Sequence, residues 1–216
     1  EDCFRDLWMK MAGKRQVIRF GEGGDVYASH VRVVPGKIIF KMSIFGTVVE
    51  VNLNRRGVHN INNALAATGA AYALGLELGT IVRGLEKAPE AIGRLNFLRQ
   101  KNGLNLLNDT YNANPISTRA AINALALEKG ARWMVFGDMG ELGPQSPEFH
   151  MQVGKHAAAA SIDRLYTIGQ NSRHALNAFG GEAKHFETHI SLIESLVQDV
   201  RDCDLLPTIL VKGSRS

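Results

Sequence analysis

Residues 108–115 read Asn108-Asp109-Thr110-Tyr111-Asn112-Ala113-Asn114-Pro115. An apolar run at 104–107 precedes them, and a segment with helical spacing of its apolar residues, 116–127, follows them. A carboxylate and several amides therefore lie at the carboxyl end of an expected strand, where open α/β sheets bind their ligands. These eight residues predict both a strand–helix unit and a ligand site.

Strand and helix patterns alternate from here to the end of the chain. We expect strands at 104–107, 133–136, 165–168, 184–186 and 208–211, and helices at 116–127, 147–160, 172–179 and 190–200. Short connections between such elements are typical of a parallel sheet covered by helices on both faces. The expected strands end in polar residues that should share one edge of the sheet: Asn108-Asp109, Gly137-Asp138, Gly169-Gln170, Glu187 and Lys212-Gly213-Ser214-Arg215-Ser216.

The first part of the chain has a different pattern. Alternating or β-branched runs predict strands at 17–20, 31–34, 37–45 and 47–53, with turns at Pro35-Gly36 and Gly46. Two helices are expected next, at about 60–74 and 77–87. We place a hinge at 91–94, so the sequence predicts an α/β protein of two units, residues 1–93 and 94–216.

The composition is that of an ordinary globular protein, with 45% hydrophobic and 21% charged residues among 216. The net charge of +4 comes from scattered cations, and no basic run is interleaved with aromatic residues, so we expect no nucleic-acid partner. Cys3 and Cys203 lie far apart in sequence and suggest a reducing compartment. No apolar stretch reaches the length of a membrane span, so we expect a cytoplasmic protein without a membrane partner.

Asp109 is a candidate for binding the two hydroxyls of a ribose, a common role of a carboxylate at a strand end. A turn or helix-capping role explains Asp109 equally well. Asn114 before Pro115 fits a helix N-cap followed by proline in the first turn, so we interpret it as structural. Tyr111 and Asn112 have no evident capping role and are candidate substrate contacts.

His59, Asn60 and Asn63 open the expected helix 60–74 and share one face at spacings of three and four residues. An asparagine amide can donate to and accept from an adenine edge at once. Helix capping would account for one asparagine but hardly for Asn60, Asn62 and Asn63 together. Arg94, at the hinge, could bind a phosphate or be a solvated arginine.

The terminal Lys212, Ser214 and Arg215 combine cations and a hydroxyl after an apolar strand, which suits a substrate phosphate or carboxylate. A frayed terminus is the alternative. In the loop 137–144, a capping acid is favoured over a metal site, and His150 in the next helix is interpreted as structural. No phosphate-binding loop and no Cys/His metal motif occurs in the sequence.

Together these motifs resemble the Mur ligases, and within them the branch that adds D-alanyl-D-alanine to UDP-N-acetylmuramoyl-tripeptide. The resemblance covers nearly the whole chain and is strongest in five segments: 57–67, Gly93-Arg94, 108–115, 137–143 and 212–216. The sequence His59-Asn60-x-x-Asn63 is typical of the whole family. The Asn108–Pro115 and Lys212–Ser216 motifs resemble the corresponding motifs of the D-alanyl-D-alanine-adding branch more than those of the other branches.

The resemblance implies that residues 1–93 form the later part of a central ATP-binding domain. Residues 94–216 would form a Rossmann-like C-terminal domain without its last helix. By the same resemblance Asn63 contacts adenine with His59 and Asn60 beside it, Arg94 reaches ribose or phosphate, and Asp109 holds the ribose. ATP would then be gripped by two closing domains.

The implied reaction uses ATP and Mg²⁺ to activate the tripeptide carboxylate as an acyl phosphate, which D-alanyl-D-alanine then attacks, in peptidoglycan precursor synthesis. The family's phosphate loop and magnesium ligands would lie upstream of Glu1. We therefore expect a C-terminal fragment that is inactive alone, and we separately expect it to be a monomer. Two alternatives stay open: another Mur or folylpolyglutamate-type ligase, although the diamino-acid-adding branch's Asp-Asn-Pro-Arg motif is absent, and a nucleotide-binding module without catalysis.

Overall fold

The computed structural model describes residues 4–34, 36–55, 57–89 and 92–214. The chain divides into two compact units, Glu1–Pro89 and Glu90–Ser216. This division falls four residues before the end of the predicted first unit, at residue 93. The two units are described separately.

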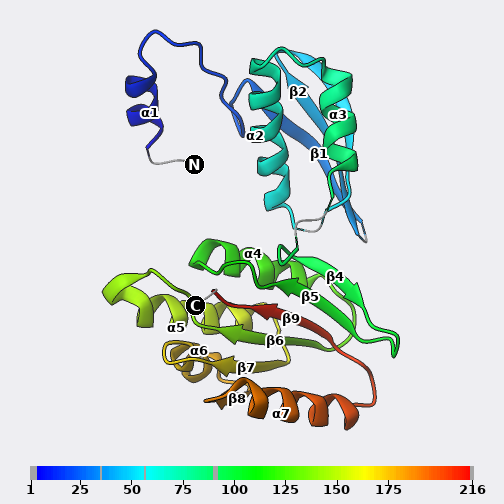
Figure 1. The fold of residues 1–216 in the computed structure, drawn as a ribbon, viewed down its shortest axis with the longest axis vertical. Helices are drawn as coiled ribbons and strands as arrows, with labels where there is room; N and C mark the ends of the chain where they lie inside the picture. Colours follow the sequence, from blue (N-terminus) through cyan, green and yellow to red (C-terminus); the bar gives the residue numbers. More distant parts are fainter. Residues whose placement is uncertain (1–3, 35, 56, 90–91, 215–216) are drawn as a thin grey trace. The chain divides into compact units, whose positions relative to one another are not determined.

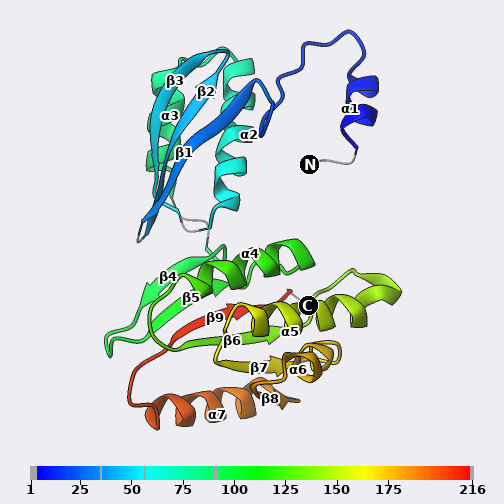
Figure 2. The same cartoon turned by 180° about the vertical axis from the view of Figure 1, so that it is seen from behind.

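The first unit contains an antiparallel sheet, β1 (Val26–Val34), β2 (Lys37–Ile44) and β3 (Thr47–Leu53), in the order β1-β2-β3. Phe45 and Gly46 connect β2 to β3, both with positive φ, as a tight two-residue hairpin turn requires. Helices α2 (His59–Ala73) and α3 (Leu78–Lys87) cover one face of this sheet (Figure 2). Alternate residues of β2, from Ile38 to Ile44, point at these helices and form the core of the unit.

Two expectations for the first unit need correction, and one helix was not expected. Residues 17–20 form no strand, because Arg19 binds Asp25 through its backbone N–H and guanidinium and so shapes a compact loop. The expected strand 31–34 is the second half of the longer β1, which has an irregular register between Ser29 and Arg32. The additional helix, α1 (Arg5–Ala12), precedes the sheet in the chain, and none of its residues is buried.

The second unit is a six-stranded sheet in the order β4-β5-β9-β6-β7-β8 (Figure 1). Its strands are β4 (Asn96–Arg99), β5 (Asn105–Asp109), β6 (Arg132–Gly137), β7 (Arg164–Ile168), β8 (Glu182–Phe186) and β9 (Thr208–Lys212). All pairings are parallel except β4 with β5. The predicted parallel sheet is confirmed, with β4 as an additional antiparallel strand at its edge.

Helices cover both faces of this sheet. One core forms where α4 (Pro115–Ala126), α5 (Ser146–Ala159) and α6 (Ser172–Phe179) pack on it, and a second forms under α7 (His189–Arg201). Strand β6 shows the alternation: Met134 and Phe136 belong to the first core, and Trp133 and Val135 to the second. A short 3₁₀ helix, η1 (Gly143–Gln145), precedes α5.

The five parallel strands all end on the same side of the sheet. We call the border formed by their carboxyl ends the rim. Across the described residues, no helix combines the length and the apolar character that crossing a membrane requires.

Candidate functional site

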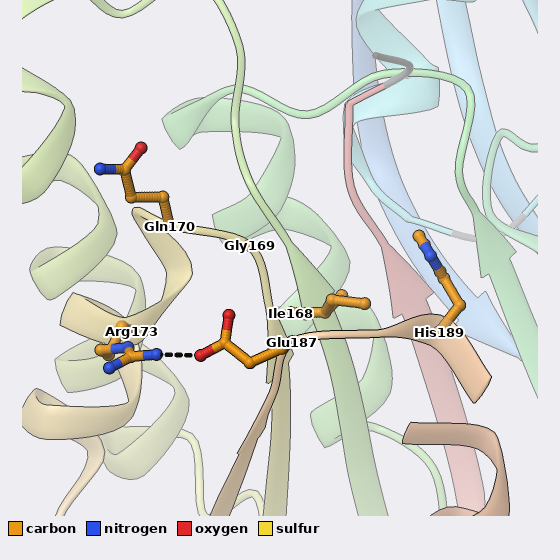
Figure 3. A pocket seen from close by; sticks show the side chains of 6 residues that line it. All are labelled: Ile168, Gly169, Gln170, Arg173, Glu187 and His189. Atoms are coloured by element: carbon orange, nitrogen blue, oxygen red, sulfur yellow. Dashed lines mark hydrogen bonds and ion pairs between the residues drawn. The ribbon is translucent and has the colours of Figure 1, made fainter. Parts of the chain in front are cut away.

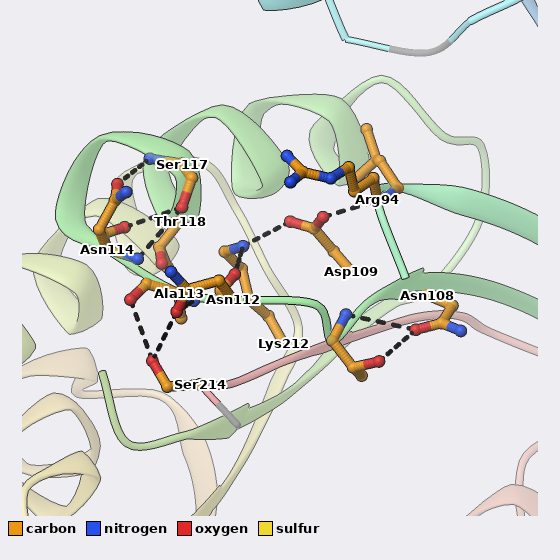
Figure 4. Close-up of polar contacts among 12 residues, drawn as sticks. Arg94, Asn108, Asp109, Asn112, Ala113, Asn114, Ser117, Thr118, Lys212 and Ser214 are labelled. Atoms are coloured by element: carbon orange, nitrogen blue, oxygen red, sulfur yellow. Dashed lines mark hydrogen bonds and ion pairs between the residues drawn. The ribbon is translucent and has the colours of Figure 1, made fainter. Parts of the chain in front are cut away.

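The strand ladder places Asp109 beside Lys212. Each is the last residue of its strand, and the parallel register of β5 and β9 pairs them directly. The ammonium nitrogen of Lys212 lies 2.5 Å from Oδ2 of Asp109 and donates to the backbone oxygen of Asn112 at 3.0 Å (Figure 4). Only 1% of the Lys212 side chain is exposed. A buried ion pair therefore lies on the rim where β5 and β9 end.

Burial and the ion pair act on Lys212 in opposite directions. Burial is the largest influence and lowers the pKa of the ammonium, while the neighbouring carboxylate of Asp109 raises it. A buried ammonium keeps its proton only if it has such a partner. The pair is therefore coupled: removing either side chain leaves the other in an unfavourable environment.

Asp109 also holds the turn that leads into β4. Its Oδ1 accepts a hydrogen bond from the backbone N–H of Leu95 at 3.0 Å. Leu95 is buried and has a φ of 56°, and Gly93 has a φ of 74°. A leucine in the left-handed region is uncommon and persists where its surroundings determine it. The Asp109 carboxylate is one of these determinants.

This turn presents Arg94 next to Tyr111. The guanidinium carbon of Arg94 lies 4.2 Å from the centre of the Tyr111 ring, a cation–π contact. The N–H of Tyr111 donates to the backbone oxygen of Gly93 at 2.9 Å, so the two segments are also joined through their backbones. Both side chains are exposed, Tyr111 by 45%. The rim thus carries an exposed cation and an exposed aromatic ring on the two segments that Asp109 and the Gly93–Tyr111 hydrogen bond connect.

Ser214 joins two loops of the rim. Its Oγ accepts a hydrogen bond from the N–H of Gly140 at 2.9 Å and lies within 3.2 Å of two acceptors, Oδ1 of Asn112 and the backbone oxygen of Ala113. One hydroxyl hydrogen can serve only one of these acceptors at a time. The loop after β5 is thereby connected to the loop after β6. Arg215, the remaining predicted contact of this segment, lies outside the described residues.

Asn114 has the structural role that the sequence indicated. Its Oδ1 accepts from the N–H of Ser117 at 2.8 Å, and the Ser117 hydroxyl accepts from the N–H of Asn114, a reciprocal cap at the start of α4. Pro115 is the first residue of that helix. This cap fixes where the loop 109–114 ends.

His59, Asn60 and Asn63 lie together in the first turns of α2, in the first unit. Nδ2 of Asn63 donates to Oδ1 of Asn60 at 3.1 Å, and Nδ2 of Asn60 lies 3.3 Å from Nε2 of His59. The N-cap residue of this helix is Val58, which makes no side-chain cap. Capping of this position therefore does not explain the asparagines. Their common face is a polar surface on the helix.

Asp138 and His150 are structural, as their sequence context suggested. Oδ1 of Asp138 accepts from the N–H groups of Asn171 and Ser172, at 3.1 and 2.7 Å, at the start of α6. His150 is fully buried, and burial lowers the pKa of its imidazole. The residues that the structure describes contain no group of three or more His, Cys, Asp or Glu side chains suited to a metal ion.

A cavity of about 520 Å³ lies farther along the rim, at the ends of β7 and β8 (Figure 3). The residues that line it are Ile168, Gly169, Gln170, Arg173, Glu187 and His189. Arg173 and Glu187 form an ion pair there. The sequence pattern marks Gly169-Gln170 and Glu187 as strand ends but does not single out Arg173 or His189. The one sequence feature that could have indicated these two is their place in the first turn of an expected helix.

Leu95 was also missed as a residue that shapes the site. Leu95 shapes the site through its backbone N–H, which donates to Asp109, and through its positive φ. A leucine in the sequence indicates neither property. The nearest indication in the sequence was Gly93, two residues earlier.

Comparison with known proteins assigns the class. Residues 93–215 match the family model described as "Mur ligase, glutamate ligase domain". This chain belongs to the Mur ligase family. The predicted fold, an α/β chain that ends in a Rossmann-like domain of this family, is confirmed for the second unit.

The relatives indicate a particular branch. The chain is 38% identical to UDP-N-acetylmuramoyl-tripeptide--D-alanyl-D-alanine ligase of Escherichia coli K12 over 97% of its length, covering 46% of that protein. It is similar to the crystal structure of MurF from Acinetobacter baumannii, with a TM-score of 0.91, 38% identity, and coverage of 100% of this chain and 47% of that one. The MurF ligase of Thermotoga maritima in complex with ADP has a TM-score of 0.80, 25% identity, and coverage of 98% and 48%. The chain spans about half the length of these relatives.

Proposed function

We propose that this chain is part of an ATP-dependent ligase that joins D-alanyl-D-alanine to UDP-N-acetylmuramoyl-tripeptide in peptidoglycan precursor synthesis. The observation that carries the proposal is its 38% identity, over 97% of the chain, to a relative with that name. The Arg94, Tyr111 and Asp109 arrangement at the rim supports it, because a ligase of this kind must hold a polyanionic nucleotide next to small zwitterionic substrates.

The reaction has two steps. The γ-phosphoryl group of ATP passes to the tripeptide carboxylate, which gives an acyl phosphate and ADP. The amine of D-alanyl-D-alanine then attacks the acyl carbon, and the tetrahedral intermediate expels phosphate and leaves a peptide bond. Positioning of the reactants and neutralisation of phosphate charge are the contributions expected of the protein.

In the second unit, we assign Arg94 to the charge of the nucleotide and Asp109 to its ribose. A guanidinium is suited to phosphate because its planar donors match the oxygens. An ionised carboxylate has about four acceptor sites. Asp109 uses two of these sites for the Leu95 N–H and the Lys212 ammonium. Its side chain is 15% exposed, so a ribose hydroxyl can donate to one of the remaining sites. Tyr111, Asn112 and Ser214 are assigned to the substrate side of this surface.

In the first unit, we assign Asn63, with His59 and Asn60, to the adenine. The contacts among the three side chains orient the Asn63 amide, which suits an amide that must both donate and accept. Mg²⁺ would neutralise phosphate charge in such a reaction, but the described residues offer no cluster of ligands that fits it. No step is therefore assigned to a metal held by this chain.

Calorimetry with the chain tests this proposal. The titrants are D-alanyl-D-alanine, ATP and ADP, together with L-lysine, diaminopimelate and glutamate as acceptors of sister ligases. We expect heat from D-alanyl-D-alanine and none from the other acceptors. A response to nucleotides alone would favour a nucleotide-binding module, and a response to another acceptor would favour a sister ligase.

A ligase assay with ATP, the tripeptide substrate and D-alanyl-D-alanine is the complement. We expect no turnover from this chain alone, because its sequence contains no phosphate-binding loop. Release of ADP that depends on the dipeptide would contradict this expectation.

A further inference from the structure

Lys212 holds the segment that contains Tyr111 from both sides. Its ammonium contacts the side chain of Asp109, two residues before Tyr111, and the backbone oxygen of Asn112, the residue after it. One buried cation therefore fixes both ends of the turn 109–112. The position of Tyr111 at the rim depends on that turn.

The same cation acts on Arg94 through Asp109. The carboxylate that accepts from Lys212 also accepts from the N–H of Leu95, the residue that follows Arg94. Leu95 has a positive φ, so this short segment adopts a conformation that leucine rarely takes without support. Lys212, Asp109 and Leu95 thus form a continuous path from β9 to the base of the Arg94 side chain.

A direct contact between Lys212 and a ligand, which the sequence suggested, fits the geometry poorly. The side chain is 1% exposed, and Asp109 and Asn112 both accept from its ammonium. A phosphate or carboxylate could reach it only if the loop 109–112 were displaced. The side chains of Arg94 and Tyr111, in contrast, are exposed.

We propose that Lys212 is a positioning residue, which presets the Arg94–Tyr111 pair at the rim without itself touching substrate. This inference deepens the proposed function, because it takes Arg94 and Tyr111 as ligand-facing residues. It makes a separate claim about the chain without ligand: the arrangement of the pair depends on the Lys212 ammonium before anything binds.

NMR of the ligand-free chain with isotope-labelled arginine and leucine tests this claim. Because the guanidinium of Arg94 lies over the Tyr111 ring, its side-chain protons carry a ring-current shift, and Tyr111→Leu gives their value without the ring. In Lys212→Met we expect the Arg94 signals to move at least halfway to that value. The Leu95 amide signal should move as well, because its acceptor loses its partner. Lys155→Met, at an exposed lysine of α5, is the matched control and should leave both signals in place.

The ligand-free signals decide between the two roles of Lys212. If Lys212→Met weakens ATP binding and leaves the Arg94 and Leu95 signals unchanged, Lys212 is a ligand contact and the proposal is overturned. Unchanged signals with unchanged affinity also overturn it. Should Lys212→Met fail to fold, Lys212→Gln replaces it, since a neutral amide keeps a donor but removes the charge. A failure of the chain to bind nucleotide would count against the proposed function and leave this test intact.

Discussion

Nε2 of His150 accepts a hydrogen bond from the backbone N–H of Met139 at 2.9 Å. Nδ1 of the same ring lies 2.7 Å from the backbone oxygen of Ser146, so Nδ1 carries the hydrogen of the neutral imidazole. A protonated ring would have no acceptor for Met139. This histidine, which the sequence context indicated to be structural, therefore holds the loop after β6 to α5.

The pH dependence of stability follows from this geometry. Burial lowers the pKa of His150, and burial also lowers the pKa values of His156 and His185. Below the unfolded value of about 6.5 the unfolded chain binds more protons than the folded one, so stability falls as the pH falls. We expect the free energy of unfolding to decrease between about pH 7 and pH 5.5. The decrease should be smaller in His150→Gln; an equal slope in both proteins would contradict this role.

Gly154 permits the close packing of α5 on α6. A Cβ atom on Gly154 would lie 2.0 Å from the backbone oxygen of Ala175, which cannot move without shifting α6. We expect Gly154→Ala to cost about 1–3 kcal/mol of stability, the range for overpacked cores. Gly84→Ala in α3, where nothing lies within 4 Å, is the matched control and should stabilise its own unit by up to about 1 kcal/mol. Thermal unfolding of the two variants measures both effects.

Asp138, which follows β6, caps the start of α6, the helix that follows β7. Its carboxylate accepts from the N–H groups of Asn171 and Ser172, and Gly169 leaves the space it needs, because a Cβ there would lie 2.5 Å from Oδ1. We expect Asp138→Ala to cost about 0.5–2 kcal/mol, the usual value of a helix cap. Chemical denaturation measures the loss. An unchanged midpoint would show that water replaces the cap.

The sequence predicted most elements of the second unit because their signals are local. Apolar runs with polar ends marked the parallel strands, and the Asn114-Pro115 pair marked the start of α4. Strand β4 was missed, because its Asn96-Phe97-Leu98-Arg99 sequence is short and its pairing with β5 is set by tertiary contacts. The position of β9 between β5 and β6 also depends on the whole sheet, and no local pattern predicts it.

The candidate site was predicted as a set of residue types without their contacts. Asp109 and Lys212 were both selected, but the sequence separates them by 103 positions, and nothing local indicates that they form a buried pair. Lys212 followed an apolar strand and preceded a glycine, which suggests an exposed anion-binding turn as readily as a buried end. Burial is a property of the folded sheet, so the distinction between a ligand contact and a positioning residue required the structure.

The coupling between Asp109 and Lys212 gives the last prediction. Lys212→Met leaves the carboxylate buried without its partner, so we expect a loss of about 3–5 kcal/mol. Asp109→Asn should cost less, because burial already lowers the pKa of Lys212 and the ammonium can release its proton. Since the pKa of Lys212 in the folded variant then lies further below the unfolded value of about 10.4, the stability of Asp109→Asn should rise more steeply than that of the parent chain from pH 7 to pH 9.

The double variant of Asp109 and Lys212 should lose less stability than the sum of the two single losses, and denaturant titrations of all four proteins measure this difference. Additive losses would mean that the two side chains stabilise the rim independently.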